Sequence, residues 1–264
     1  MKFSRNIDPR VAWLRASFPW PVIPRRFFAG LILLNLAFTA LADPVAHLAE
    51  NSQKAQPWPD GVIPYDISKL TDTQKTIARR AMQRWEDTGA NIKFIPHRTQ
   101  VEYVNFTGNT NAGNNTSHVG YLKGERTDIN ITEFWWRDLE WMPAHELGHV
   151  LGFFHEHQRW DRDQFVTVHY ENIKAGRAHD YDAIAKTNWL VTSLPYDYRS
   201  IMHYRVCWAG ACENDCTDGD GDSPCAVLSP KDKKFGRVIG QWTENQISAL
   251  DAERVRLVYG IKTK

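Results

Sequence analysis

Three histidines and one glutamate stand at spacings that suit metal-dependent hydrolysis. The segment from His145 to His155 reads H-E-x-x-H-x-x-G-x-x-H. On an α-helix, residues four apart lie one turn apart on the same face, so His145 and His149 can reach one zinc ion at about 2.0–2.1 Å. Glu146 would lie beside the metal, where its carboxylate could take a proton from an attacking water.

His155 needs a break in this helix before it can join the same metal. If the helix continued, His155 would lie ~15 Å beyond His145 along the axis. Gly152 offers the break, because glycine adopts the left-handed conformation that ends many helices. The chain could then turn back and present His155 as a third ligand. Three neutral imidazoles leave one coordination position open for water, which is typical of a catalytic rather than a structural zinc site.

A second segment of interest, Ser200-Ile201-Met202-His203-Tyr204, follows downstream. A lone methionine most often fills space in a hydrophobic core. Because Met202 follows the long histidine motif at a suitable distance, we interpret it as a thioether that packs beneath the three histidines.

Together, residues 145–163 and 200–204 resemble the astacin family of metzincin zinc endopeptidases. Residues 58–65 resemble the start of that family's catalytic domain, and residues 228–259 loosely resemble its C-terminal stretch. The resemblance implies that residues 58–262 form an α+β catalytic domain.

In that family, an upper lobe with a mixed sheet and two long helices faces a less regular lower lobe across the active-site cleft. Transferred to this chain, the upper lobe covers residues 58–152 and the lower lobe covers residues 153–262.

The resemblance also implies roles for individual residues. It makes His145, His149 and His155 the zinc ligands and Glu146 the general base. Tyr204 matches a tyrosine that can serve as a further zinc ligand and, after moving aside, stabilise the tetrahedral intermediate. A phenol O–H directed at a developing oxyanion suits that role.

Two further features follow from the resemblance. Glu156 matches an acid that lies near the new N-terminus in mature family members, and residues 117–121 match an edge strand that binds the substrate backbone.

We therefore expect a secreted endopeptidase that acts on protein or peptide substrates. The alternative is a non-catalytic protein that keeps the zinc fold and holds an envelope or partner peptide in its cleft. The presence of Glu146 and Tyr204 favours the enzyme.

The first 42 residues have the pattern of a secretory signal. A basic region with net charge +5 ends at Arg25-Arg26 and precedes the apolar run Phe27–Ala42, which closes with Ala-Leu-Ala. We expect cleavage after Ala42 and a secreted or periplasmic protein, with the Sec and twin-arginine routes both open. An uncleaved anchor is the alternative, but the run is shorter than the ~20 residues of a membrane span.

Removing this segment would change the net charge from +1 to −4. A mildly acidic chain gives no reason to expect a nucleic-acid partner, and we expect a monomer with no stable membrane insertion. We interpret residues 43–57 as a short pro-segment or a mature N-terminal extension.

A Cys-rich loop spans residues 207–225 and contains all the cysteines of the chain, which are Cys207, Cys212, Cys216 and Cys225. In an exported protein we expect two disulfides whose pairing is open; a structural zinc bound by four thiolates is the alternative. The acidic run 218–222 offers carboxylates for Ca²⁺. It lacks the distal Glu of an EF-hand loop, so a solvated turn is the preferred interpretation.

The sequence also predicts the elements that must position these residues. Thr71 and Gln74 form a capping box before an apolar stripe, which predicts a helix over residues 72–88 that ends at Gly89. Pro64 favours an edge position for the strand that contains it. Alternating apolar residues predict strands over 62–65, 92–96, 101–106, 117–122 and 128–132.

Two more helices are predicted in the second half of the chain. A weak helical pattern covers residues 180–189. A second capping box at residues 243–246 predicts a C-terminal helix. Its inward-facing residues would be Ile247, Leu250, Val255 and Val258.

Overall fold

The computed structural model describes residues 54–111, 115–136, 141–207, 212, 221–240 and 247–263. All of these residues belong to one compact unit, which covers 42–264. The predicted signal, residues 43–53, Cys216, the acidic residues 218–220 and the predicted capping box at 243–246 lie outside the described residues. Within the described part, no helix combines the length and the apolar character that a membrane crossing requires.

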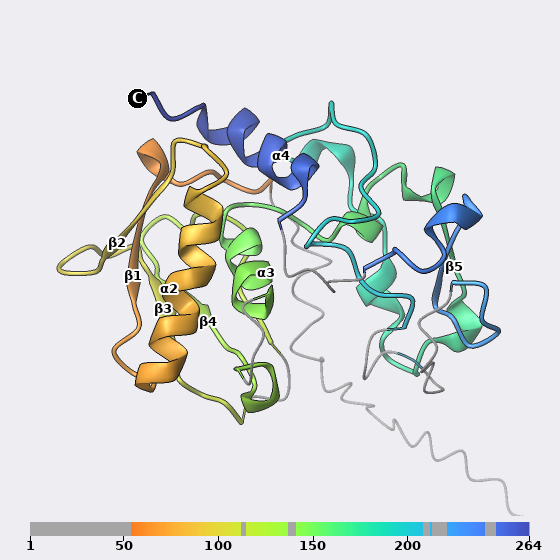
Figure 1. Cartoon of the computed structure of the whole chain (residues 1–264), viewed down its shortest axis with the longest axis horizontal. Helices are drawn as coiled ribbons and strands as arrows, with labels where there is room; N and C mark the ends of the chain where they lie inside the picture. Colours follow the sequence, from red (N-terminus) through yellow and green to blue (C-terminus); the bar gives the residue numbers. More distant parts are fainter. Residues whose placement is uncertain are drawn as a thin grey trace, which may run out of the picture. The chain divides into compact units, whose positions relative to one another are not determined.

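The long helix α2 (Asp72–Glu86) confirms the first helix prediction. Thr71 Oγ1 accepts a hydrogen bond from Gln74 N, and the Gln74 side chain accepts one from Thr71 N, so the predicted capping box is present. The apolar stripe faces the core and packs against helix α3 (Trp141–Val150), beside which α2 lies in Figure 1. Trp85 donates its indole N–H to Ala144 O of α3 at 2.8 Å.

Four parallel strands form the main sheet, in the order β2-β1-β3-β4. They are β1 (Val62–Asp66), β2 (Lys93–Pro96), β3 (Val104–Phe106) and β4 (Thr127–Ile129). The predicted edge position of Pro64 is wrong, because β1 lies between β2 and β3. Proline is tolerated there because Pro64 pairs with Ile95 of β2, whereas pairing with β3 begins only at Tyr65.

The predicted strand over residues 117–122 is replaced by one isolated antiparallel bridge, between Thr116 and Asn130. Beyond this bridge the segment finds other partners. Gly120 N donates to His149 O, and Tyr121 N donates to Gln56 O, both at 2.8 Å. The segment thus joins the end of α3 to the N-terminal stretch instead of continuing along β4.

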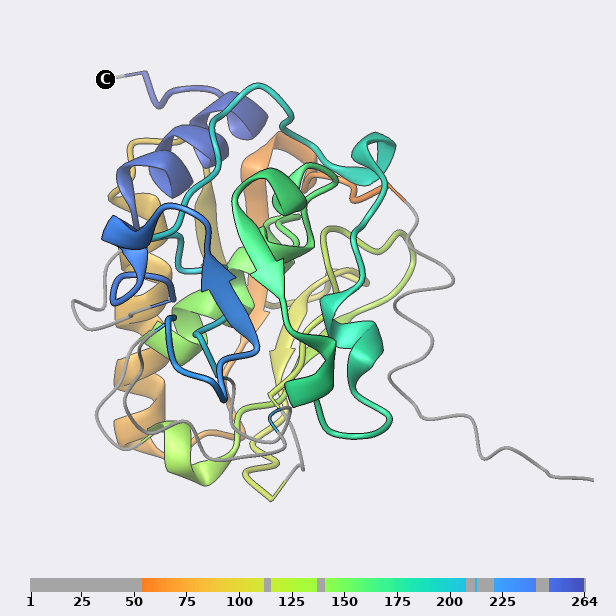
Figure 2. The same ribbon diagram turned by 90° about the vertical axis from the view of Figure 1, so that its right-hand side faces the viewer.

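Short turns and a small sheet make up most of the chain after α3 (Figure 2). Strand β5 (Val166–Val168) pairs antiparallel with β6 (Leu228–Pro230). The 3-10 helices of the described residues are η1 (Pro59–Gly61), η2 (Glu133–Trp136), η3 (Glu156–Gln158), η4 (Arg162–Gln164), η5 (Tyr170–Asn172), η6 (Ala178–Tyr181), η7 (Lys186–Asn188) and η8 (Lys233–Phe235).

The predicted helix over 180–189 is wrong, because η6 and η7 are separate turns with extended backbone between them. Asp182 and Ala185 have ψ values of 140° and 138°. Ile184 N donates to Gln158 O at 2.7 Å, so this stretch is bonded to a distant segment rather than to itself.

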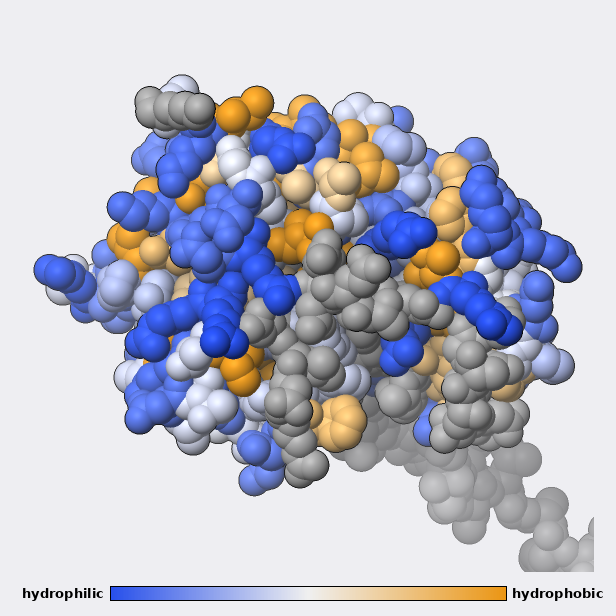
Figure 3. Space-filling model, in the orientation of Figure 1, coloured by the Kyte–Doolittle hydropathy of each residue, from blue (hydrophilic) through white to orange (hydrophobic). Residues whose placement is uncertain are grey.

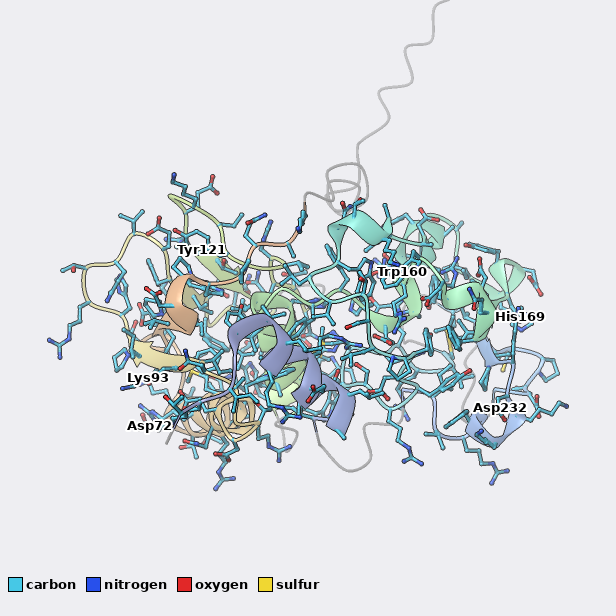
Figure 4. The ribbon with its side chains drawn as sticks, turned by 90° about the horizontal axis from the view of Figure 1, so that it is seen from above. Asp72, Lys93, Tyr121, Trp160, His169 and Asp232 are labelled. Carbon is cyan, nitrogen blue, oxygen red and sulfur yellow. A yellow bond between two sulfur atoms is a disulfide. The ribbon has the colours of Figure 1, made fainter. Side chains whose placement is uncertain are left out.

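The C-terminal helix α4 (Ala249–Tyr259) begins after Ser248, whose side chain accepts from Asp251 N while the Asp251 side chain accepts from Ser248 N. The capping box of this helix therefore lies later than the predicted one. Val255 is fully buried, and so, less expectedly, are Asp251 and Arg254. In Figure 4, α4 crosses the middle of the ribbon, between the part that carries Lys93 and the part that carries His169.

Two main hydrophobic clusters form most of the interior of the described residues, beside a minor third one of Ala55, Phe154 and Trp189. The larger one joins the main sheet, α2 and α3, and it also includes Ile201 and Met202. The smaller one surrounds β5 and β6 and is rich in tyrosine, with Tyr181, Tyr196 and Tyr198 among its members. The face shown in Figure 3 is mainly hydrophilic, with scattered hydrophobic areas. The α+β class is confirmed, with the regular elements concentrated before residue 152.

Candidate metal centre and active site

Helix α3 ends just before Gly152, which has φ 98°. Gly152 N donates to His149 O at 2.8 Å, and Phe153 N donates to Gly148 O at 3.1 Å. This pair of bonds forms a Schellman motif, whose left-handed residue is most easily a glycine. The chain then reverses and brings His155 back towards the helix.

The three histidines meet at one point. His155 Nε2 lies 3.2 Å from His145 Nε2 and 3.1 Å from His149 Nε2. Tetrahedral zinc with Zn–N bonds of about 2.0–2.1 Å separates its nitrogen ligands by roughly 3.3 Å, so the spacing suits zinc. Among the described residues, these three histidines form a group whose ligand atoms all lie within 4.8 Å of one another, so they could hold a metal ion.

Hydrogen bonds fix the tautomer of each ring. The other ring nitrogen, Nδ1, of His145 donates to Ile201 O at 2.7 Å, and that of His149 donates to Phe153 O at 2.7 Å. His155 Nδ1 lies 3.1 Å from Gln158 Oε1. With each Nδ1–H engaged, the Nε2 lone pairs face one another, and a cation between them would relieve their repulsion.

Burial keeps these imidazoles neutral. It lowers the pKa of His145 to about 4 and that of His149 to about 3, and the pKa of His155 falls well below its ordinary value for the same reason. A neutral imidazole is the form that binds a metal, so the ligands need not lose a proton first.

Glu146 lies in the same buried environment as the histidines on α3. Burial raises the pKa of its carboxyl group to about 8, and a hydrogen bond from Ser117 opposes this shift. Ser117 Oγ lies 2.7 Å from Glu146 Oε2 and 3.1 Å from Glu146 O, so one hydroxyl fixes the orientation of this side chain.

Met202 packs directly against α3, between the turns that carry the two helical histidines. Gly148 makes this contact feasible: a Cβ at that position would lie 2.4 Å from Met202 Sδ and 3.1 Å from the Trp85 ring. The preceding residue, Ile201, supplies the carbonyl that holds His145. The Met202 segment therefore supports the metal site from below and orients one ligand.

Tyr204 lies beside the third histidine. Its ring centroid is 4.3 Å from that of His155 and 4.3 Å from that of His157, on which it stacks at an interplanar angle of 28°. Burial raises the pKa of the Tyr204 phenol well above its ordinary value, so the group keeps its proton. It is thus a hydrogen-bond donor at the edge of the site.

Glu156 is fully buried next to His155. Its Oε1 accepts from Arg159 Nη1 at 3.1 Å and from Asp197 N at 2.9 Å, and its Oε2 accepts from Arg254 Nη2 at 2.9 Å. These partners all belong to the folded domain. The expected contact of Glu156 with a processed N-terminus stays a prediction.

The expected disulfides are present as far as the described residues reach. Cys207 is bonded to Cys212, which leaves too few thiolates for the alternative four-cysteine zinc site. Cys225 is also disulfide-bonded, and Cys216 lies outside the described residues. Ca²⁺ binding by the acidic run stays a prediction.

Several residues that form the site were not predicted from the sequence. They are Gly148 beneath the helix, Gln158 beside His155, and the buried pair Asp251 and Arg254. The available signal for Gly148 was its position inside a helix, where glycine costs about 1 kcal/mol relative to alanine. Asp251 looks like an ordinary capping residue in the sequence, so it carried no signal of its second role.

Comparisons with known proteins agree with this geometry. A family model described as Astacin (Peptidase family M12A) matches residues 50–260. Tolloid-like protein 2 of Mus musculus is 39% identical over 159 residues, which are 59% of this chain and 15% of that protein. Astacin-like metalloprotease toxin 1 of Loxosceles intermedia is 37% identical over 155 residues, which are 56% of this chain and 54% of that protein.

A solved structure has the same fold. High choriolytic enzyme 1, a hatching enzyme zinc-protease from Oryzias latipes, matches with a TM-score of 0.63 and 25% identity, covering 80% of this chain and 96% of that one. The structure of myroilysin matches with a TM-score of 0.52 and 21% identity, over 78% of this chain and 97% of that one.

The fold and the three-histidine site define a metallopeptidase domain. The chain belongs to the astacin family, peptidase family M12A. It spans from about a seventh to about half the length of the two relatives named above.

Proposed function

We propose that this chain is a zinc-dependent endopeptidase that hydrolyses peptide bonds in protein or peptide substrates. One observation carries the proposal: the Nε2 atoms of His145 and His149 both lie within 3.2 Å of His155 Nε2, and Glu146 stands on the same helix as His145 and His149. The membership of this chain in the astacin family supports the same conclusion. A protein that only binds a peptide would have no need of Glu146.

In this mechanism, bound zinc would supply Lewis acidity to the scissile carbonyl and to the attacking water. His145, His149 and His155 would hold the ion through Nε2, because their Nδ1 atoms are already engaged. The positive charge of the ion would lower the raised pKa of the Glu146 carboxyl group, so that Glu146 can accept the proton of the attacking water and later deliver it to the leaving amine. Ser117 keeps the Glu146 carboxylate in place during both transfers.

Tyr204 would donate its phenolic proton in a hydrogen bond to the oxygen of the tetrahedral intermediate. Its place beside His155 and its raised pKa support this role, because the phenol remains protonated at neutral pH. The stacked His157 ring limits the directions in which the Tyr204 ring can move.

Replacing Glu146 by Gln tests the mechanism. Cleavage of casein should fall by about 10²–10⁴-fold while bound zinc stays at parent level, because the shape of the side chain is kept and the base is lost. Glu253→Gln, on the surface of α4, is the matched control and should leave cleavage unchanged. Undiminished, chelator-resistant cleavage by the Glu146 variant would contradict the proposal.

Replacing Tyr204 by Phe tests the second role. We expect kcat to fall by about 10²–10³-fold, as for loss of one oxyanion donor, with zinc content unchanged. An equal loss of zinc and of turnover would make Tyr204 a structural residue instead.

We further propose export before the enzyme acts, with removal of residues 1–42. The support is the basic-apolar-small pattern of that segment. N-terminal sequencing of the exported protein tests this proposal, and an N-terminus at Met1 would exclude it.

A further inference from the structure

Helix α4 reaches the segments beside the three histidines through two buried residues, Arg254 and Asp251. Arg254 is 3% exposed and bridges two buried acids: Nη2 lies 2.9 Å from Glu156 Oε2, and Nη1 lies 3.1 Å from Asp251 Oδ1. Glu156 is the chain neighbour of His155, and its backbone N donates to Met202 O at 3.0 Å. The guanidinium therefore connects the C-terminal helix to the segment that carries the third metal ligand.

The other acid leads to a second ligand. Asp251 Oδ2 accepts from Ile201 N at 2.8 Å, and Ile201 O in turn accepts from His145 Nδ1 at 2.7 Å. Asp251 Oδ1 also accepts from Ser200 Oγ at 2.7 Å, and the same hydroxyl accepts from Met202 N at 3.0 Å. Through Asp251, Nη1 of Arg254 is thus linked to Ile201, whose carbonyl group orients His145. Nη2 of Arg254 contacts Glu156, the residue that follows His155.

The positive charge of Arg254 balances buried carboxylates that few other groups could neutralise. Three buried acids, Glu156, Asp197 and Asp251, lie close together. Burial, together with the nearby charge of Asp251, raises the pKa of Asp197 to about 6. Arg159 is the other buried guanidinium here, but it also pairs with Asp161 at 2.9 Å. Without Arg254, the remaining positive charge would be shared among too many carboxylates.

We propose that Arg254 is a positioning residue for the metal site, which holds the Glu156 and Asp251 carboxylates so that His155 and His145 stay aligned for the ion. The inference rests on the zinc site of the proposed function. It adds that the alignment of two ligands depends on a contact from the C-terminal helix rather than only on the histidine motif itself.

The test compares Arg254→Met with Arg256→Met in the full chain. Arg256 lies on the same helix, pairs with Glu253 and donates to Thr88 O at 2.7 Å without contacting Glu156 or Asp251 in any described bond, and provides a matched control. We expect the affinity for Zn²⁺, measured by competition with a chromophoric chelator, to fall by about 10–100-fold in Arg254→Met, in line with the loss of groups that orient metal ligands. Arg256→Met should stay within about twofold of the parent.

A second readout is independent of metal. In zinc-free protein, amide hydrogen exchange across residues 155–158 and 200–203 should speed up in Arg254→Met, while exchange in α2 stays unchanged. Arg254→Lys should recover only part of the Zn²⁺ affinity, because an ammonium cannot reproduce the two-armed contact. Parent-like Zn²⁺ affinity in Arg254→Met, or an equal loss in both arginine variants, would overturn the proposal.

Loss of folding in Arg254→Met is covered by the double variant Glu156→Gln/Arg254→Met, which removes both charges of the Glu156–Arg254 pair and leaves Asp251 with its bonds from Ser200 Oγ and Ile201 N. We expect the folded double variant to bind Zn²⁺ at least about tenfold more weakly than the parent, and parent-like binding would again overturn the proposal. These readouts do not require peptidase activity. A parent protein that binds zinc but cleaves nothing would defeat the proposed function and leave this inference intact.

Discussion

Two of the three histidines that we propose as zinc ligands stand on a helix packed in an apolar core, whereas the third stands in a segment held by buried charges. Around His145 and His149, α3 is fixed by α2 and by Trp85. Around His155, the neighbouring Glu156 is held by Arg159 and Arg254.

The difference shows how an irregular segment can hold a ligand as firmly as a helix does. Apolar packing is non-directional, so it fixes α3 as a whole and the helix geometry then sets the spacing of its histidines. A stretch without regular structure has no such internal spacing. Charge-assisted hydrogen bonds have defined directions and can fix single residues, at the cost of burying charge.

The largest expected effects come from breaking each region separately. Asp251→Asn keeps the shape of the side chain but sets an amide against donors on Arg254 and Ile201, which should cost about 3–5 kcal/mol. Ile63→Ala, in the fully buried centre of β1, should cost about 2–5 kcal/mol by leaving a cavity. Urea unfolding measures both changes.

The two variants should differ in what else they disturb. Below the unfolding transition, Asp251→Asn should weaken Zn²⁺ binding, whereas Ile63→Ala should leave it close to the parent. Equal weakening by both would mean that zinc affinity simply follows overall stability, and the contrast between the two regions would fail.

A smaller effect sharpens the contrast at the helix ends. Thr71 and Ser248 both cap a helix through a capping box, but Ser248 Oγ also donates to the buried Asp197 Oδ2. We expect Thr71→Ala to cost about 1 kcal/mol and Ser248→Ala about 2 kcal/mol, because the second change also removes a bond to a charged group. Thermal unfolding of both variants at one pH measures the difference, and equal costs would show that the Asp197 bond contributes nothing.

The sequence was most informative where one local rule decides the structure. The capping box at Thr71, the apolar stripe that follows it and the histidine spacing on α3 each depend on helix geometry alone. The predictions for Pro64 and for residues 180–189 failed because long-range pairing decided there. Pairing between β1 and β3 begins at Tyr65, one residue after Pro64, so the proline is accommodated. A hydrogen bond from Ile184 N to Gln158 O replaces the bond that a helix over residues 180–189 would need.

The buried charge network could not be predicted from local sequence patterns, because it too depends on long-range contacts. Glu156 and Arg254 are far apart in the sequence, and neither lies in a pattern that indicates burial. Their pairing depends on where α4 lies, which is set by the whole domain. The grouping of the three histidines could thus be predicted from one short motif, but the buried charges beside His155 could not.

Gly148 has one more consequence. Because even a single added carbon at this position would overlap Met202, the depth to which the Met202 segment approaches α3 is set by the absence of a side chain. Positions 148 and 202 therefore share one fixed volume, and a side chain at 148 requires a residue smaller than methionine at 202. Two motifs that look separate in the sequence are in this sense a single steric element.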